Sequence, residues 1–128
     1  MKYLLDTHAV IWYFEDSSRL PSNAKDIIDN TTNRIFLSSI SFWEIAIKIN
    51  SGKLKLNMSF DKVLDHVKKG DFEVVQIEDE YLKMLSVLPY IHNDPFDRLL
   101  IATALAENLT IITVDENIHK YDVTWIWS

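Results

Sequence analysis

The sequence predicts an α/β fold in which helices flank a mainly parallel central sheet of about five strands. Two observations support this fold class. Short apolar runs alternate with segments whose apolar residues have helical spacing, and only the connection before the last strand is too short for a full crossover. No repeat or low-complexity segment interrupts the 128 residues, of which 48% are hydrophobic. We therefore expect a single domain over residues 1–128.

The predicted strands are short apolar runs bounded by polar or acidic residues. They cover residues 2–6, 34–38, 72–77, 110–114 and 122–127. In the last run Trp125 and Trp127 share one face, and we expect both rings in the core. The first run stops at Asp6, and Asp115 follows the fourth. Both acids are therefore expected at the carboxyl ends of strands.

The predicted helices begin at polar caps. They cover residues 8–14, 23–31, 42–50, 60–69, 79–88 and 95–107. Thr7 is the expected cap of the first helix, and Ser22 or Asn23 caps the second. Ser41 and Glu44 have the Ser-x-x-Glu form of a capping box before the third. Glu44 would then open a helix directly after the second strand.

The last of these helices begins at an Asp-Pro-x-Asp motif. Pro95 suits a first helical position, Asp94 before it suits an N-cap, and Asp97 lies in the first turn. Free N–H groups and the helix dipole favour an ionised carboxylate at Asp97. A plain capping box would explain both acids without any further function. The distinction depends on whether other carboxylates lie nearby.

Composition narrows the class of protein. The chain has no cysteine and no apolar run near the roughly 18 residues of a membrane span. Because Asp6 follows so soon after the start, no signal peptide is expected, and we expect a cytoplasmic protein. The net charge of −6 argues at first against nucleic acid. If four of the 19 acidic residues bind metal, however, 15 remain against 13 basic residues.

The basic residues are unevenly distributed. Six lysines fall within about twenty residues, opposed only by Asp61 and Asp65. They are Lys48, Lys53, Lys55, Lys62, Lys68 and Lys69. This cluster is either a solvated helical face or a surface that grips a phosphate backbone.

Four carboxylates are predicted at one edge of the sheet. Asp6 and Asp115 end strands, while Glu44 and Asp97 open helices. Right-handed crossovers would bring all four to the carboxyl edge, where ligands of such sheets gather. Clustered negative charges imply a cation between them, and all-oxygen ligands favour Mg²⁺ or Mn²⁺ over zinc. The four histidines lack the paired spacing of a zinc site.

The motifs around these acids resemble those of PIN-domain nucleases, most closely the VapC-like toxins of type II toxin–antitoxin pairs. They read LLDTH at 4–8, WEIA at 43–46, DPFDRL at 94–99 and TVD at 113–115. The resemblance covers essentially the whole chain. It implies a PIN-like fold with Asp6, Glu44, Asp97 and Asp115 as the catalytic and metal-binding residues.

The resemblance also implies an activity. PIN nucleases of this kind hydrolyse RNA and leave a 5′-phosphate and a 3′-hydroxyl, with Mg²⁺ or Mn²⁺ as cofactor. Asp6, Asp97 and Asp115 would hold the metal, with Asn117 available to assist Asp115. Glu44 would ligate through water or position the attacking hydroxide. Asp94 is explained as the helix cap.

Partners follow from the same resemblance. We expect an RNA substrate, a cognate antitoxin with a segment inserted near the acids, no membrane, and a homodimer. Trp12, Phe14 and residues 42–67 are candidate dimer surfaces, although core packing explains the aromatic residues equally well.

Two other functions stay open. One is a catalytically silent PIN-fold binding module whose acids serve as caps and as a partner surface. The other is a metal-dependent small-molecule phosphohydrolase with Asp6 as nucleophile. That chemistry usually needs a second Asp two positions later, where this chain has His8.

The roles of several neighbouring residues also stay open. His8 and His92 are either structural or orient substrate, and Arg98 either binds phosphate or a partner or forms an ordinary helix contact. Thr7 and Thr113 are either simple caps or orient carboxylates and water.

Overall fold

The central sheet of the protein has five strands, all parallel. A computed structural model describes residues 1–128 and gives the strand order β3-β2-β1-β4-β5. The strands are β1 (Lys2–Leu5), β2 (Arg34–Ser38), β3 (Phe72–Val75), β4 (Thr110–Ile112) and β5 (Trp125–Ile126). Each neighbouring pair is parallel, including β4 with β5. The predicted fold class is confirmed, and the last connection is longer than expected because it contains a helix.

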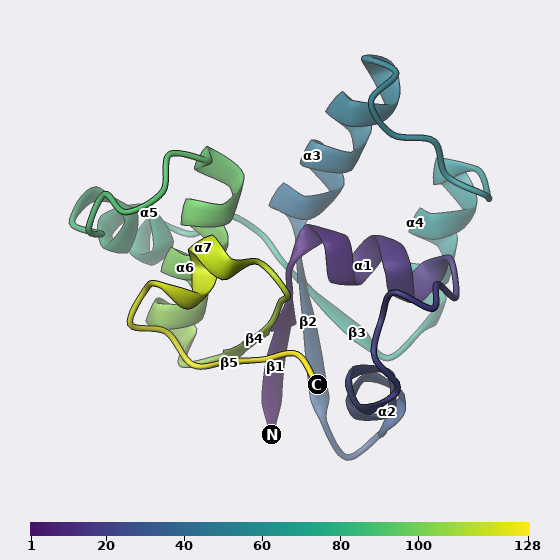
Figure 1. Ribbon diagram of the computed structural model, residues 1–128, viewed down its shortest axis with the longest axis horizontal. Helices are drawn as coiled ribbons and strands as arrows, with labels where there is room; N and C mark the ends of the chain where they lie inside the picture. Colours follow the sequence, from purple (N-terminus) through teal and green to yellow (C-terminus); the bar gives the residue numbers. More distant parts are fainter.

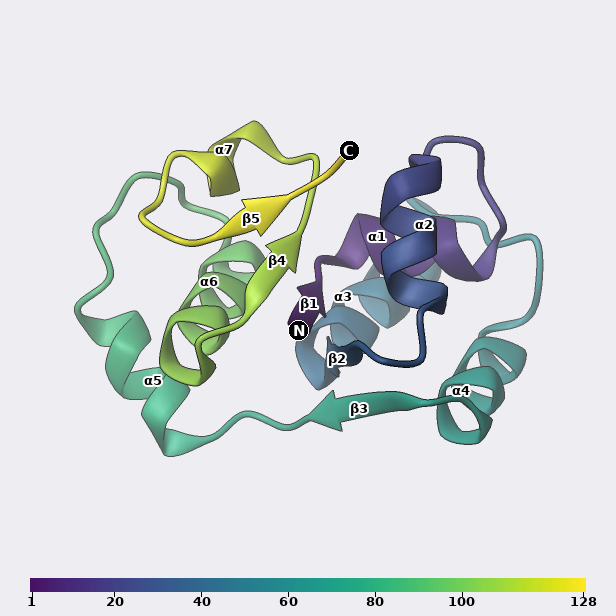
Figure 2. The same ribbon diagram turned by 90° about the horizontal axis from the view of Figure 1, so that it is seen from below.

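Seven helices surround this sheet. They are α1 (Thr7–Phe14), α2 (Ser22–Asp29), α3 (Ser39–Asn50), α4 (Phe60–Lys69), α5 (Asp79–Ser86), α6 (Pro95–Glu107) and α7 (Glu116–His119). Figures 1 and 2 show α1, α2 and α4 on one side of the sheet and α5 and α6 on the other. No helix is long and apolar enough to cross a membrane.

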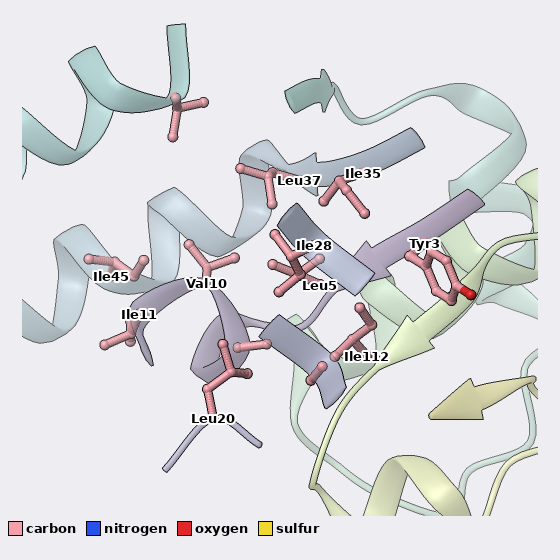
Figure 3. Packing of buried hydrophobic residues seen from close by; sticks show 13 residues of the cluster. Tyr3, Leu5, Val10, Ile11, Leu20, Ile28, Ile35, Leu37, Ile45 and Ile112 are labelled. Carbon is pink, nitrogen blue, oxygen red and sulfur yellow. The ribbon is translucent and has the colours of Figure 1, made fainter. Parts of the chain in front are cut away.

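Alternation along β1 divides the core into two clusters. Tyr3 and Leu5 face the cluster formed with α1, α2 and α3, which Figure 3 shows. Leu4, between them, faces the cluster formed with α5, α6 and α7. This period of two, buried on both faces, is what a central parallel strand requires.

The strand order reverses between β1 and β4. The chain builds β1, β2 and β3 outward in one direction and then returns to place β4 on the other side of β1. In open α/β sheets, ligands bind beyond the carboxyl ends of the strands at such a switch point. Figure 1 shows α1 and α3 beginning at the carboxyl ends of β1 and β2.

Three predicted helix caps are wrong. Neither Ser22 nor Asn23 caps α2, because the helix already includes both and its N-cap position is Pro21, which makes no side-chain cap hydrogen bond. Asp6 rather than Thr7 is the N-cap of α1, and it accepts a hydrogen bond from the Ala9 amide. Ser38 rather than Ser41 caps α3, because β2 runs directly into the helix and Ser38 is the first polar side chain available. Glu44 therefore lies inside α3 and does not open it. The predicted cap Asp94 is confirmed, and α6 ends at Asn108, whose backbone is left-handed (φ 56°).

The C-terminal aromatic residues do not share one environment. Trp127 packs against the first core cluster, but Trp125 is 42% exposed and its ring stacks on His119. Because β5 ends at Ile126, Trp127 lies beyond the strand and approaches Trp12 of α1, with ring centroids 5.7 Å apart. The expectation that both rings lie in the core is therefore wrong for Trp125.

Arg98 is a structural residue of α6. It is buried, and its guanidinium donates to the carbonyl oxygen of Pro89 (3.0 Å) and to the hydroxyl of Tyr121 (3.1 Å). It also lies over the Tyr90 ring, 4.4 Å from the centroid. The contacts hold the loop before α6 against the α7 region. Of the roles left open for Arg98, these contacts favour the structural one.

Replacement of Arg98 by methionine should destabilise the fold. The change leaves the Pro89 carbonyl and the Tyr121 hydroxyl without their donor, which should cost about 2–4 kcal/mol of unfolding free energy. Denaturant unfolding of Arg98→Met measures this cost. The control Arg19→Met, at an exposed position, should cost no more than about 0.5 kcal/mol. Equal effects of the two variants would contradict the structural role.

Candidate metal centre

Asp6 lies at the switch point between β1 and β4. Its Oδ1 accepts from the Ala9 amide at 2.8 Å, and its Oδ2 accepts from the Thr113 hydroxyl at 2.5 Å. Thr113 follows β4, so this bond joins the ends of two neighbouring strands. Burial raises the pKa of Asp6, and the bond from Thr113 partly offsets that effect.

Glu44 points inward from the second turn of α3. It is 5% exposed, its Oε1 accepts from the Thr7 hydroxyl at 2.7 Å, and its Oε2 accepts from Lys48 Nζ at 2.7 Å. The Ser41 hydroxyl lies 3.1 Å from that of Thr7. Thr7 and Thr113 thus both orient carboxylates, so of the roles left open for them, the contacts favour this one.

Asp97 carries the clearest electrostatic sign of a charged site. It lies in the first turn of α6, beside the N-cap Asp94, whose Oδ1 accepts from the amides of Phe96 and Asp97. Burial and then the charges of Asp94, Asp115, Asp6 and Glu44, in that order, together raise the pKa of Asp97 to about 8. The other three predicted acids therefore all act on Asp97 through space.

Asp115 is the N-cap of α7. Its Oδ1 accepts from the Asn117 amide at 2.8 Å, and its own amide donates to the Thr113 hydroxyl at 3.0 Å. The same threonine hydroxyl therefore links Asp115 to Asp6. Asn117 supports Asp115 through its backbone, while its side-chain oxygen accepts from Lys120 at 3.4 Å.

The ligand atoms that lie closest together come from the α6 side of the site. His92, Asp94 and Asp97 each offer an atom within 4.8 Å of the other two, and this is the one such group in the protein. His92 Nε2 lies 3.4 Å from Asp97 Oδ2. The structure thus adds His92 and Asp94 to the predicted acids. Asp94 is thus the cap of α6, and one of its carboxylate oxygens also lies in this group.

The donor set fits a hard dication. It consists of carboxylates, partly buried and mutually repelling, with one imidazole at the rim. A divalent ion would remove the repulsion that raises the pKa of Asp97, and oxygen ligands suit Mg²⁺ or Mn²⁺. Asp6, Glu44 and Asp115 are not in the close group of ligand atoms formed by His92, Asp94 and Asp97, and what links them to that group is the effect of their charges on the pKa of Asp97.

Lys48 brings positive charge into this site, which the sequence analysis did not foresee. Its hydrogen bond to Glu44 raises its pKa, and the charges of Glu44, Asp94 and Asp97 act in the same direction. The four-residue spacing of Glu44 and Lys48 on one helix is the sequence signal from which this pair could have been predicted. Lys53 and Lys55 of the predicted cluster lie between α3 and α4, and the remaining three lysines lie on α4, which is away from α6 and α7 (Figure 1).

His8 lies at the rim beside Asp6. It is exposed on α1, its ring stacks on Trp12 with centroids 5.4 Å apart, and its charge lowers the pKa of Asp6. His119, in contrast, is held by the carbonyl oxygen of Thr113 at 2.9 Å. His8 and His92 are therefore the histidines next to the acids.

Comparison with known proteins identifies the family. The PIN domain matches residues 3–123. The chain belongs to the PIN-domain family. This PIN domain is similar to the curated protein Ribonuclease VapC22 from Mycobacterium tuberculosis (strain ATCC 25618 / H37Rv), with 24% identity over 123 residues, which cover 92% of this chain and 90% of the relative. The resemblance to VapC-like PIN proteins is confirmed.

Solved structures agree with this PIN fold. VapBC2 from Rickettsia felis, bound to a DNA fragment from their promoter, aligns with a TM-score of 0.75 and 19% identity, covering 100% of both chains. FitAcB from Neisseria gonorrhoeae aligns with a TM-score of 0.68 and 17% identity over 97% of this chain and 96% of that one. VapBC-1 from nontypeable Haemophilus influenzae gives 0.68 and 18%, over 98% and 97%. At these identities the likeness concerns the fold.

Replacement of Asp97 by asparagine should stabilise the metal-free PIN domain at pH 8. Because the folded-state pKa of Asp97 is about 8 against an ordinary 3.8, the folded protein holds a proton that the unfolded chain has released. The wild type should therefore lose stability as pH rises from about 4 to about 8. The loss should reach a few kcal/mol, since each pKa unit is worth about 1.4 kcal/mol.

Urea unfolding in EDTA at several pH values measures this dependence. Asp97→Asn should flatten the curve between pH 4 and 8. Asp61→Asn, an exposed acid in the first turn of α4, should leave it unchanged. A wild-type stability that rises across this interval, or an equal effect of both variants, would contradict the prediction.

Proposed function

We propose that this PIN domain is a Mg²⁺- or Mn²⁺-dependent endoribonuclease and the toxin of a toxin–antitoxin pair. The observation that carries the proposal is the electrostatic state of Asp97, whose pKa is raised to about 8 by burial and then by the charges of Asp94, Asp115, Asp6 and Glu44. The similarity to Ribonuclease VapC22 supports an RNA substrate.

Each carboxylate has a distinct role in the proposal. Asp6, Asp97 and Asp115 hold the metal, and Thr113 fixes the first of them while also bonding the backbone of the third. Glu44, oriented by Thr7, positions the attacking water. When bound, the metal would lower the pKa of that water and neutralise charge on the phosphate. No protein nucleophile is then required.

The contacts of Asp6 argue against the phosphohydrolase alternative. A covalent mechanism needs one free carboxylate oxygen facing the substrate phosphorus. Asp6 is 2% exposed, and both of its oxygens accept hydrogen bonds. These contacts suit a metal ligand better than a nucleophile.

The proposed partners rest on the structural relatives. VapBC-1 and FitAcB, the similar solved structures, carry the names of two-component complexes, which supports an antitoxin partner for this chain. For the homodimer, Trp43 and Ile47 on α3 are the better candidate surface, at 58% and 43% exposure. Trp12 and Phe14 instead pack against the core. A cytoplasmic location, where RNA and a newly made antitoxin are both present, remains part of the proposal.

Loss of one metal-binding carboxylate should abolish RNA cleavage. Asp6→Asn and Asp97→Asn should each cut total RNA at least about 100-fold more slowly than the wild type in Mg²⁺ or Mn²⁺, because even partners of metal ligands are worth 10–100-fold. Mapping of cut ends, with EDTA as the metal-free control, measures this. Asp61→Asn should retain full activity. Wild-type rates in both folded site variants would refute the assignment.

Divalent metal should also stabilise the protein. At 100 times its dissociation constant, Mn²⁺ should add about 2.7 kcal/mol to the unfolding free energy of the wild type. Asp97→Asn should lose most of that gain, as measured by thermal unfolding with and without the ion. A silent binding module whose acids serve only as caps would show no gain in either protein.

A further inference from the structure

Lys48 occupies the position of a cation beside the acids. Its ammonium lies 2.7 Å from Glu44 Oε2, and its side chain is 38% exposed while that of Glu44 is 6% exposed. The lysine therefore reaches from the solvent side toward a buried carboxylate. Its charge also acts on Asp94 and Asp97 on the neighbouring helix α6. One ammonium thus lies within electrostatic reach of three of the carboxylates.

Each carboxylate oxygen of Glu44 accepts one hydrogen bond. Thr7 donates to Oε1 from inside the fold, and Lys48 donates to Oε2 from outside. Thr7 is buried and begins α1, so it cannot withdraw without moving that helix. Lys48 has a flexible stem with solvent beside it and can withdraw at little cost. A metal ion bound near Glu44 would place a second positive charge beside that ammonium, and the two charges would repel each other.

We propose that Lys48 is a built-in counter-ion whose charge competes with that of the divalent metal ion beside Glu44. In the metal-free protein it stabilises the cluster of carboxylates, and metal binding releases it toward solvent. Lys48 is therefore a positioning residue that sets the metal affinity of the site. This inference rests on the proposed function, because it assumes the metal site described there.

The direction of its effect separates this role from a purely structural one. If Lys48 only held α3 in place, removal of the ammonium would loosen the site and weaken metal binding. If it competes with the metal, the same change should tighten binding by about tenfold or more, because a positive charge next to a partly buried dication repels it strongly. It should also lower the melting temperature of the metal-free protein.

Titration calorimetry of the RNA-free protein with Mn²⁺ tests the proposal. Lys48→Met should bind Mn²⁺ about tenfold more tightly than the wild type or better, and Lys48→Arg, which keeps the charge, should bind like the wild type. Lys25→Met is the matched control, because Lys25 forms an equivalent pair with Asp29, four residues away, at 2.8 Å on α2. Its affinity should not change. Unchanged or weaker binding in Lys48→Met would overturn the proposal.

Two further measurements keep the test decisive. If Lys48→Met does not fold, Lys48→Gln replaces it. In the wild type, Mg²⁺ should shift the NMR signal of the Lys48 ammonium and leave that of Lys25 in place, and a static Lys48 signal at saturating Mg²⁺ would overturn the proposal. RNA cleavage is scored separately. A chain that binds Mn²⁺ as expected but cuts no RNA would refute the proposed ribonuclease and leave the role of Lys48 standing.

Discussion

Repulsion between carboxylates at one edge of the sheet is the constraint on which the site depends. The topology requires it, because β1 and β4 meet where the strand order reverses and α6 begins at the same edge. Burial and the charges of Asp94, Asp115 and Asp6 then all oppose the ionisation of Asp97. A fold that only had to be stable would place neutral side chains there.

The fold offsets this repulsion with local features. Asp6 caps α1, Asp115 caps α7 and Asp97 lies in the first turn of α6, so each carboxylate meets free N–H groups and the positive end of a helix dipole. Thr113 adds a hydroxyl that bonds the side chain of one acid and the backbone of another. These contacts fix the geometry of the carboxylates but supply no full positive charge. A bound cation would therefore stabilise the carboxylates more strongly.

Local patterns predicted the fold and the positions of the acids, and contacts made only in three dimensions explain what they missed. The Asp-Pro-x-Asp motif located the start of α6 correctly, because cap and proline preferences act within a single turn. The start of α3 was misplaced, because Ser38 and Ser41 are equally good caps in sequence and only the end of β2 decides between them. His92 was expected to neighbour the acids, but its contact with Asp97 depends on a loop path that Arg98 holds, and no spacing rule predicts that contact. Trp125 was misplaced because β5 is shorter than its apolar run.

Helix α6 shows how stability and the site are joined in consecutive residues. Asp97 faces the acidic cluster, where burial and neighbouring charge oppose its ionisation, whereas Arg98 is buried with its donors satisfied by Pro89 and Tyr121. The arginine holds the loop that carries His92 toward Asp97. The contacts of Arg98 therefore fix the part of α6 from which Asp97 faces the other carboxylates. Because both residues lie on one helical turn, α6 cannot move to relieve the repulsion without breaking the contacts of Arg98, and the electrostatic strain stays at the site where a metal ion can relieve it.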